Sequence, residues 1–236
     1  MLLAALDAGN TRVHAALFAP LADGVVLVER REDPDFLRWR VPVAEVVYAS
    51  VRPELDRRLE RAVKAGWDLR ARKMGRDFPA AIRNRTRRPG QTGADRLANA
   101  VAAWRRWKRA CVVVDLGTAI TVDIVNGKGD FVGGAIAPGL AAMARALHGG
   151  TSLLPLVPPR PRAALGRDTK SAIEAGLYAA ARGVIGVGRH LVKGPARLYG
   201  TGGDARWFAS LFDEFVPHLT LEGIALSWLQ SRGRLR

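Results

Sequence analysis

A short pattern, an apolar run that ends in an acidic residue and a glycine, occurs once in each half of this chain. The first copy ends in Asp7-Ala8-Gly9-Asn10-Thr11 and the second in Asp115-Leu116-Gly117-Thr118. A further apolar run follows each copy, at residues 13–18 and 120–125. Each half is therefore predicted to contain two adjacent strands joined by an acidic, glycine-containing turn. A chain built this way is predicted to fold as two related α/β domains.

The residue types in these turns suit the binding of phosphate. Glycine lets backbone N–H groups come close to an anion, and Thr or Asn adds a side-chain donor. Aspartate would repel a phosphate unless a cation lies between the two, so the pattern also implies a metal ion. One Asp-x-Gly is an ordinary turn sequence, but two copies in equivalent positions favour a nucleotide polyphosphate as ligand. The sequence thus predicts a phosphotransferase.

Composition limits the alternatives. The chain has 236 residues, of which 48% are hydrophobic, enough for two small domains. No apolar run approaches the roughly 20 residues that a membrane helix needs, and the first six residues are too short for a secretory signal. The single cysteine, Cys111, cannot form an intramolecular disulfide and falls in a predicted buried strand. We expect no membrane partner and a cytoplasmic location.

The formal net charge of +15 is unusual for a small enzyme. It would suit a nucleic acid or another polyanion. The arginines are spread along the chain, however, and no helix-turn-helix or aromatic-interleaved basic segment accompanies them. We favour a compositional bias with solvated faces and do not expect a nucleic-acid partner. The four histidines lack zinc-ligand spacing, and P-loop and Rossmann fingerprints are absent.

Apolar periodicity divides the chain near Lys108. The first part, 1–108, is predicted to hold three strands in a meander (2–6, 13–18, 25–31), a strand at 46–50, a helix at 53–65, a loop at 75–93 that reaches a site, and a helix at 94–108. The second part, 109–236, is predicted to hold strands at 110–114, 120–125, 131–136 and 197–199, helices at 138–147 and 169–191, and two final helical stretches. The glycines of the long helix, Gly176, Gly183, Gly186 and Gly188, favour a close helix partner.

Three further segments have both a structural and a functional interpretation. Gly93-Ala94-Asp95-Arg96 opens a predicted helix, so Asp95 either caps the helix or takes a proton from a substrate hydroxyl while Arg96 binds an anionic group. Gly133 to Leu140 either shapes a pocket or allows tight packing. Thr201-Gly202-Gly203 is either a nucleotide loop or an ordinary connection between a strand and a helix.

Taken together, these motifs resemble the type III pantothenate kinase family. The segments that carry the resemblance, in the family's order, are Asp7-Ala8-Gly9-Asn10-Thr11, Gly93-Ala94-Asp95-Arg96, Val114-Asp115-Leu116-Gly117-Thr118-Ala119, Gly133-Gly134-Ala135-Ile136-Ala137-Pro138-Gly139-Leu140, Thr201-Gly202-Gly203 and Leu219-Thr220-Leu221-Glu222-Gly223. The resemblance implies two ribonuclease-H-like domains of the actin, hexokinase and sugar-kinase type, with mixed sheets flanked by helices. It also implies ATP-dependent phosphorylation of pantothenate to 4'-phosphopantothenate, the first step of coenzyme A synthesis.

The resemblance also implies roles for individual residues. Asp95 matches the general base, and Gly93, Ala94, Asp95 and Arg96 match the pantothenate-binding segment. Thr169 matches a threonine that reaches the neighbouring subunit's site in a homodimer. The residues matched to the ATP phosphates are Asp7, Ala8, Gly9, Asn10, Thr11, Arg12, Val13, His14 and Thr118. Asp7 matches a Mg²⁺ ligand, and Asp115 matches the ligand of a monovalent cation, K⁺ or NH₄⁺.

The chain departs from the family in one place. Thr86 and Arg88 stand where relatives often carry the Tyr and Asn of a Tyr-x-Asn-Pro segment. One pantothenate contact is therefore altered. Two alternatives stay open: a kinase of another small hydroxy acid or sugar on the same fold, and a non-catalytic regulator that associates with nucleic acid.

Overall fold

The computed structural model describes the whole chain except residues 10–11, 33–38, 40, 193 and 236. The described chain divides into two compact units. Unit 1 comprises Met1–Lys108, Gly129–Phe131 and His218–Arg236, and unit 2 comprises Arg109–Lys128 and Val132–Pro217. Within the described residues, no helix is long and apolar enough to span a bilayer.

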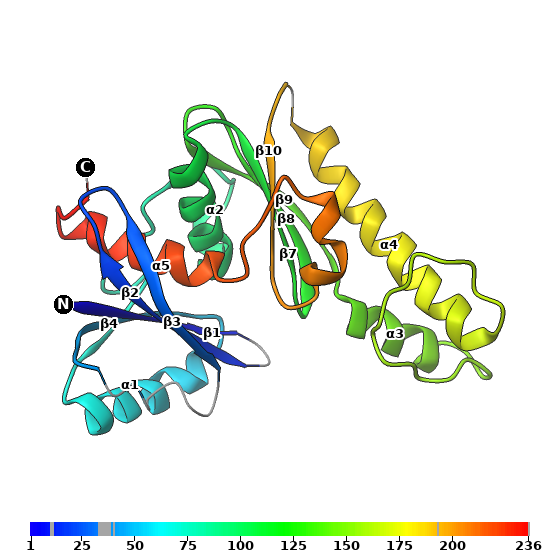
Figure 1. Cartoon of the computed structure of the whole chain (residues 1–236), viewed down its shortest axis with the longest axis horizontal. Coiled ribbons are helices and arrows are strands. Elements are labelled where there is room, and N and C mark those ends of the chain that lie inside the picture. Colours follow the sequence, from blue (N-terminus) through cyan, green and yellow to red (C-terminus); the bar gives the residue numbers. More distant parts are fainter. Residues whose placement is uncertain (10–11, 33–38, 40, 193, 236) are drawn as a thin grey trace. The chain divides into compact units, whose positions relative to one another are not determined.

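Unit 1 is built on a five-stranded mixed sheet with the order β3-β2-β1-β4-β5 (Figure 1). Its strands are β1 (Leu2–Ala8), β2 (Val13–Pro20), β3 (Val25–Glu32), β4 (Val43–Ser50) and β5 (Ala71–Lys73). Strands β1, β2 and β3 form the antiparallel meander that the sequence predicts, and β4 lies parallel to β1. The helices of this unit are α1 (Pro53–Trp67), α2 (Ala94–Trp107) and α5 (Leu219–Ser231), with a short 3₁₀ turn, η2 (Pro89–Gln91).

The last helix corrects the predicted domain boundary. The sequence assigns 109–236 to a second domain, but α5 belongs to unit 1. Every residue from Leu219 to Leu229 is buried, and Leu221, Ile224 and Trp228 share a core with Leu3 of β1. A helix that is apolar on nearly all sides has to be enclosed by other elements, and in unit 1 those elements are the sheet and α2.

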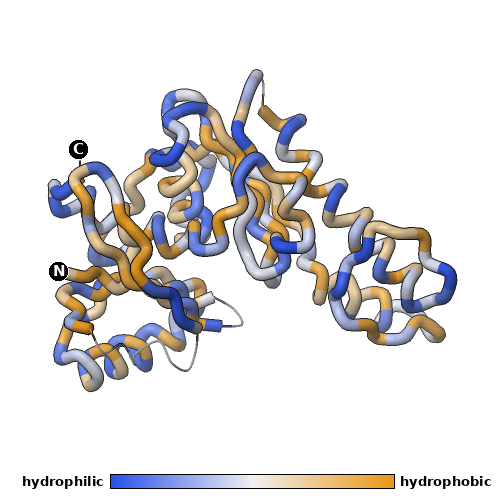
Figure 2. Tube along the Cα trace, in the orientation of Figure 1, coloured by the Kyte–Doolittle hydropathy of each residue, from blue (hydrophilic) through white to orange (hydrophobic). Residues whose placement is uncertain are grey.

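Unit 2 contains most of a six-stranded mixed sheet with the order β11-β10-β7-β8-β9-β6. Its strands are β7 (Cys111–Leu116), β8 (Ala119–Val125), β9 (Asp130–Pro138), β10 (Arg197–Thr201) and β11 (Glu214–Phe215), and its helices are α3 (Leu140–Gly149), α4 (Thr169–Leu191) and the 3₁₀ helix η3 (Ala205–Leu211). Strand β6 (Arg83–Asn84) pairs with Asp130 and Phe131, which belong to unit 1. Strand β3, at the edge of the unit 1 sheet, changes from hydrophobic residues in its first half to hydrophilic residues in its second (Figure 2).

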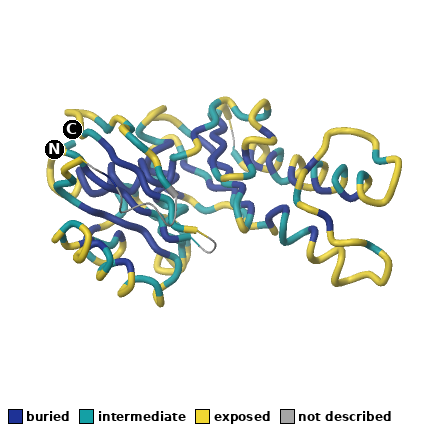
Figure 3. Tube along the Cα trace, turned by 60° about the horizontal axis from the view of Figure 1, so that its bottom comes forward, coloured by how far each residue is buried: buried dark blue, intermediate teal, exposed yellow. Residues whose placement is uncertain are grey.

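Helix α4 buries one face against the unit 2 sheet. Ile173, Leu177, Ala181 and Ile185 recur at helical spacing and share a core with Val112 and Val122. The opposite face of α4 and most of the segment between α3 and α4 are exposed (Figure 3). Helix α4 has the bounds that the sequence predicts, because a capping box at Asp168 and Ser171 marks its start.

Three very short strands, β5, β6 and β11, are not predicted from the sequence. Each has only two or three residues, and each includes a charged residue, so no apolar alternation identifies it. The predicted loop at 75–93 is therefore interrupted by β6 and η2. These two elements hold the part of that loop which matters most for the candidate site.

Candidate active site

The first acidic turn joins β1 and β2 in unit 1. Asp7 pairs with His14 and Ala8 with Val13 in the antiparallel ladder, and the Gly9 N–H donates to the Arg12 carbonyl over 3.1 Å. Asp7 and His14 are half-buried and Arg12 is exposed. Asn10 and Thr11, which the sequence assigns to phosphate binding, lie outside the described residues. The described part of this turn has the strand-turn-strand form that the sequence predicts.

The second acidic turn joins β7 and β8 in unit 2. Asp115 pairs with Thr121, and the Gly117 N–H donates to the Ala119 carbonyl over 3.0 Å. Asp115 is half-buried at the end of a buried strand, and Thr118 is exposed at the tip. The turn thus presents a hydroxyl and a carboxylate at the same edge of the sheet.

Two other glycine turns of unit 2 pack directly against this second turn. A Cβ added to Gly139 would lie 2.6 Å from the Thr118 carbonyl oxygen and would overlap that of Gly117. Gly202 has a φ of +90°, and a Cβ there would lie 2.5 Å from the Leu116 carbonyl oxygen and would overlap the Asp115 carboxylate. Gly202 is therefore required both by its backbone conformation and by the lack of space for a side chain, and Gly139 by the lack of space alone. The structure therefore brings together Asp115, Thr118 and two glycine-rich segments that the sequence could only name separately.

Asp95 lies in the first turn of α2. Gly93 is the N-cap, and the Asp95 carboxylate accepts a hydrogen bond from the Arg96 backbone N–H over 2.9 Å. This contact satisfies one N–H of the helix start, as the structural interpretation of Asp95 predicts. A carboxylate can accept several hydrogen bonds, so the contact is compatible with a second role as a base.

Helix α5 supports α2 just behind Asp95. The Thr220 hydroxyl donates to the Asn99 side-chain oxygen over 2.8 Å, and both residues are buried. A Cβ on Gly223 would overlap the Ala98 carbonyl, so glycine permits the close approach of the two helices. Asn99 is one turn after Asp95. The motif 219–223 is thus explained as support for the helix that carries Asp95.

A half-buried ion pair adds to this support. Arg106 of α2 donates two hydrogen bonds to the Glu222 carboxylate, at 3.1 and 2.7 Å. His218 lies 3.8 Å from the same carboxylate. Burial lowers the pKa of His218 below its ordinary value, and the Arg106 and Arg30 cations lower it further. At neutral pH Arg106 is therefore the charged partner of Glu222.

A hollow of about 450 Å³ lies beside the Asp95 segment. It is lined by three arginines and three uncharged polar residues: Thr86, Arg87, Arg88, Gln91, Thr92 and Arg96. Sequence reasoning placed Arg96 in the substrate segment and noted Thr86 and Arg88 as departures, but it missed Arg87, Gln91 and Thr92. The run of arginines in the loop at 75–93 was the available signal.

Comparison with known proteins decides the family. The sequence profile described as type III pantothenate kinase matches residues 3–187. A type III pantothenate kinase of Anaeromyxobacter sp. (strain K) is 33% identical over 99% of this chain and 100% of the relative. The chain belongs to the type III pantothenate kinase family.

Solved structures agree on the fold. The chain superposes with a TM-score of 0.64 and 22% identity on a Campylobacter jejuni protein assigned to the Baf family of transcriptional activators, over 100% of both chains. Component A of the Acidaminococcus fermentans (R)-2-hydroxyglutaryl-CoA dehydratase superposes with a TM-score of 0.53 and 13% identity, over 99% and 98% of the two chains. These likenesses show the fold alone. They agree with the predicted α/β class.

The remaining site residue matched to pantothenate kinases, Thr169, is the first residue of α4 in unit 2. It is exposed, and the Asp168 carboxylate before it accepts the Ser171 N–H over 2.9 Å. Hydrogen bonds from Ser171 lower the pKa of Asp168. The helix start is thus fixed, and Thr169 faces solvent in the single chain.

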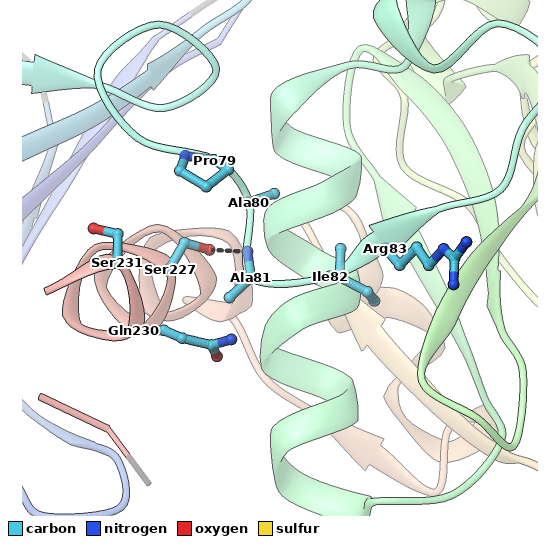
Figure 4. A pocket seen from close by; sticks show the side chains of 8 residues that line it. All are labelled: Pro79, Ala80, Ala81, Ile82, Arg83, Ser227, Gln230 and Ser231. Atoms are coloured by element: carbon cyan, nitrogen blue, oxygen red, sulfur yellow. Dashed lines mark hydrogen bonds between the residues drawn. The ribbon is translucent and has the colours of Figure 1, made fainter. Parts of the chain in front are cut away.

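A second hollow, of about 380 Å³, contains none of the predicted site residues (Figure 4). It lies between the segment 79–83 and α5, where the Ala81 N–H donates to the Ser227 hydroxyl over 3.1 Å. Its one charged lining residue, Arg83, extends away from Ser227 and Gln230 (Figure 4). This hollow lacks an acid or base, so it is not a candidate for the chemistry of a kinase.

Proposed function

We propose that this chain transfers the γ-phosphoryl group of ATP to the primary hydroxyl of pantothenate, the first step of coenzyme A synthesis. The observation that carries the proposal is family membership along the whole chain, together with the position of Asp95 beside an arginine-lined hollow. Pantothenate has a hydroxyl at one end and a carboxylate at the other. An acid-base group next to a cationic hollow suits such a molecule.

Asp95 is proposed as the general base. Its carboxylate would take the hydroxyl proton as the substrate oxygen attacks the γ-phosphorus and ADP leaves. The N-terminal end of α2 holds this carboxylate through the Arg96 N–H. Gly93, Ala94 and Arg96 would complete the substrate segment. As the family resemblance implies, Thr118 and the residues Asp7 to His14 would contact the phosphates of ATP.

The residues present fit the divalent ion that accompanies ATP in kinases. Mg²⁺ keeps several waters and is held by one or two carboxylates together with substrate phosphates, so a single carboxylate is sufficient on the protein. Among the described residues, no cluster of three or more acidic, His or Cys side chains forms a metal site. Asp7 is the proposed ligand. When bound, the ion would neutralise phosphate charge.

A monovalent cation is proposed at Asp115. A Cβ added to Gly202 would overlap both the Asp115 carboxylate and the Leu116 carbonyl oxygen, so these two oxygen atoms lie close to the same point. Hard cations such as K⁺ are bound by oxygen ligands of this kind. A cation here would stabilise the turn that carries Thr118.

A cytoplasmic homodimer is the proposed assembly. On the exposed face of α4, apart from the helix's own backbone, no atom of the described residues lies within 4 Å of the Cβ positions of Gly176, Gly183 and Gly186, which leaves space for a second helix. Gly188 differs, because a Cβ there would lie 2.8 Å from Val112 of the chain's own sheet. Such a dimer would bring Thr169 to the neighbouring subunit's substrate.

The net charge of +15 keeps a second candidate, a regulator that binds nucleic acid. Binding of this kind would fall steeply with salt whether or not it were specific. Competition between a specific duplex and random DNA at physiological salt would separate the two cases. If neither the specific duplex nor random DNA binds at physiological salt, the nucleic-acid regulator is excluded and the kinase remains.

The proposed function is tested by ADP release from Mg-ATP with pantothenate, with K⁺ or Na⁺ as the only monovalent cation. Pantothenate-dependent release would support the proposal, and a higher rate in K⁺ would support the Asp115 site. Release with a sugar or another hydroxy acid, and none with pantothenate, would keep the mechanism and replace the substrate. No release with any of these compounds would contradict the kinase.

A further inference from the structure

The hollow beside Asp95 has a strongly one-sided charge. Of its six lining residues, Arg87, Arg88 and Arg96 are cationic and none is acidic. Guanidinium groups bind carboxylates through two parallel hydrogen bonds. The hollow is therefore suited to a carboxylate or another oxyanion.

A hydrogen-bond network centred on Asn84 shapes the loop that forms this hollow. The Asn84 amide donates to the Pro89 carbonyl over 3.2 Å and to the Thr92 hydroxyl over 3.0 Å. Its side-chain oxygen accepts from the Thr86 N–H at 3.0 Å and from the Thr86 hydroxyl at 2.9 Å. Thr86 thus holds the loop in place, and its hydroxyl is already hydrogen-bonded within the protein.

Arg88 is the better fixed of the two adjacent arginines. Its carbonyl accepts the Gln91 N–H over 3.0 Å, and the next carbonyl, that of Pro89, accepts the Thr92 N–H over 3.2 Å. The η2 turn and Asn84 therefore constrain the backbone on which Arg88 is carried. Among the described residues, none forms a hydrogen bond with the backbone of Arg87.

Among the described residues, no acidic side chain neutralises the charge of Arg88. Within the described chain no carboxylate forms an ion pair with Arg87 or Arg88, whereas Arg85 pairs with Asp130 over 3.3 Å. Arg96 lies over the ring of Phe131, with 5.7 Å between the guanidinium carbon and the ring centroid. An exposed cation on a fixed backbone is prepared to bind an anion with little loss of conformational freedom.

We infer that Arg88 is a specificity-determining residue that binds the substrate carboxylate in this hollow. The inference rests on the proposed function. It makes Arg88 the residue by which this enzyme selects pantothenate over neutral analogues. Thr86 and Asn84 are then positioning residues for that contact.

The test compares Arg88→Gln with Arg87→Gln, a matched removal of one exposed charge from the same hollow. Each variant is assayed with pantothenate and with pantothenol, which has a neutral hydroxymethyl group instead of the carboxylate. Loss of one charge-assisted contact predicts a roughly 10–100-fold fall in the pantothenate-to-pantothenol ratio of kcat/KM for Arg88→Gln. Most of it is expected in the KM for pantothenate. Arg87→Gln should lower the ratio by less than about threefold.

Two further readouts keep the result interpretable. Arg88→Lys keeps the charge but not the two-pronged geometry, so it should recover part of the ratio. Circular dichroism and turnover of pantothenol report whether each variant is folded. An unchanged ratio in Arg88→Gln, or equal losses in both Gln variants, would overturn the inference. The proposed function would still stand in that case, provided that the wild type phosphorylates pantothenate. Absence of that wild-type turnover would instead contradict the proposed function.

Discussion

The two acidic turns have nearly the same sequence but very different surroundings. In unit 2 the turn at Asp115 is backed by Gly139 and Gly202, whose missing side chains leave room for its carbonyl and carboxylate oxygens. In unit 1, among the described residues, a Cβ on Gly9 would meet only the Arg12 carbonyl, at 3.5 Å, so Gly9 itself, like the equivalent Gly117 of unit 2, is not required by close packing. A repeated motif therefore fixes the local backbone, while neighbouring segments decide how rigidly it is held. The units also differ in their proposed chemistry, since the proposed general base, Asp95, belongs to unit 1.

The largest effect is expected from removing the chemistry of unit 1. Asp95→Asn should lower kcat by roughly 10²–10⁴-fold, because the amide cannot take the hydroxyl proton. Binding of Mg-ATP, measured by calorimetry, should stay close to that of the wild type. A near-normal kcat would return Asp95 to its capping role at the start of α2.

The next effect is expected at the supported turn of unit 2. Gly202→Ala places a side chain at a φ of +90° and against Asp115, so unfolding free energy should fall by about 1–3 kcal/mol. The affinity for ATP should fall with it, because the turn that carries Thr118 has to move. Urea unfolding and ATP titration check both. An unchanged affinity would mean that this turn does not contact the nucleotide.

Unfolding of the units can be followed separately. Five of the six tryptophans, Trp39, Trp67, Trp104, Trp107 and Trp228, belong to unit 1, and the single cysteine, Cys111, belongs to unit 2. Burial raises the pKa of Cys111 to about 12, so its thiol should react only after the strand opens. Gly202→Ala should therefore increase the rate at which the Cys111 thiol is labelled. The urea midpoint detected by tryptophan fluorescence, which reports mainly on unit 1, should change little.

A smaller effect is expected from acid, and it should concern unit 1. The pKa of His218 is lower in the folded state, so the unfolded chain binds more protons as pH falls from about 6.5. Folding stability should decrease over this range. His218→Asn should remove that share of the decrease, seen as a flatter dependence of the tryptophan-detected midpoint on pH. Equal slopes in the two proteins would exclude this role for His218.

The smallest effect is expected at Gly9, in the first acidic turn. Gly9→Ala should change stability by less than about 0.5 kcal/mol, since the φ of Gly9 is not left-handed and its neighbour is in ordinary contact. Its urea midpoint should match the wild type. A loss as large as that of Gly202→Ala would show that the two turns are equally constrained.

Local sequence predicts much of this fold. Helix α4 has the predicted bounds, 169–191, and the strands around both acidic turns follow from apolar runs. Long-range packing is not visible in the same way. The inclusion of α5 in unit 1 depends on Gly223 fitting against Ala98, and nothing near residue 223 in the sequence indicates that partner. Likewise the hollow at Arg88 depends on Asn84, whose hydrogen bonds define the loop only after folding.

The central claim is that this chain phosphorylates pantothenate, and identification of the product tests it most directly. Phosphorus NMR would follow purified protein with Mg-ATP and pantothenate, beside the Asp95→Asn variant. We expect ADP and a new phosphomonoester to form in equal amounts with the wild type, and neither at a comparable rate with the variant. Formation of ADP and inorganic phosphate without a phosphomonoester, or no consumption of ATP, would contradict the account.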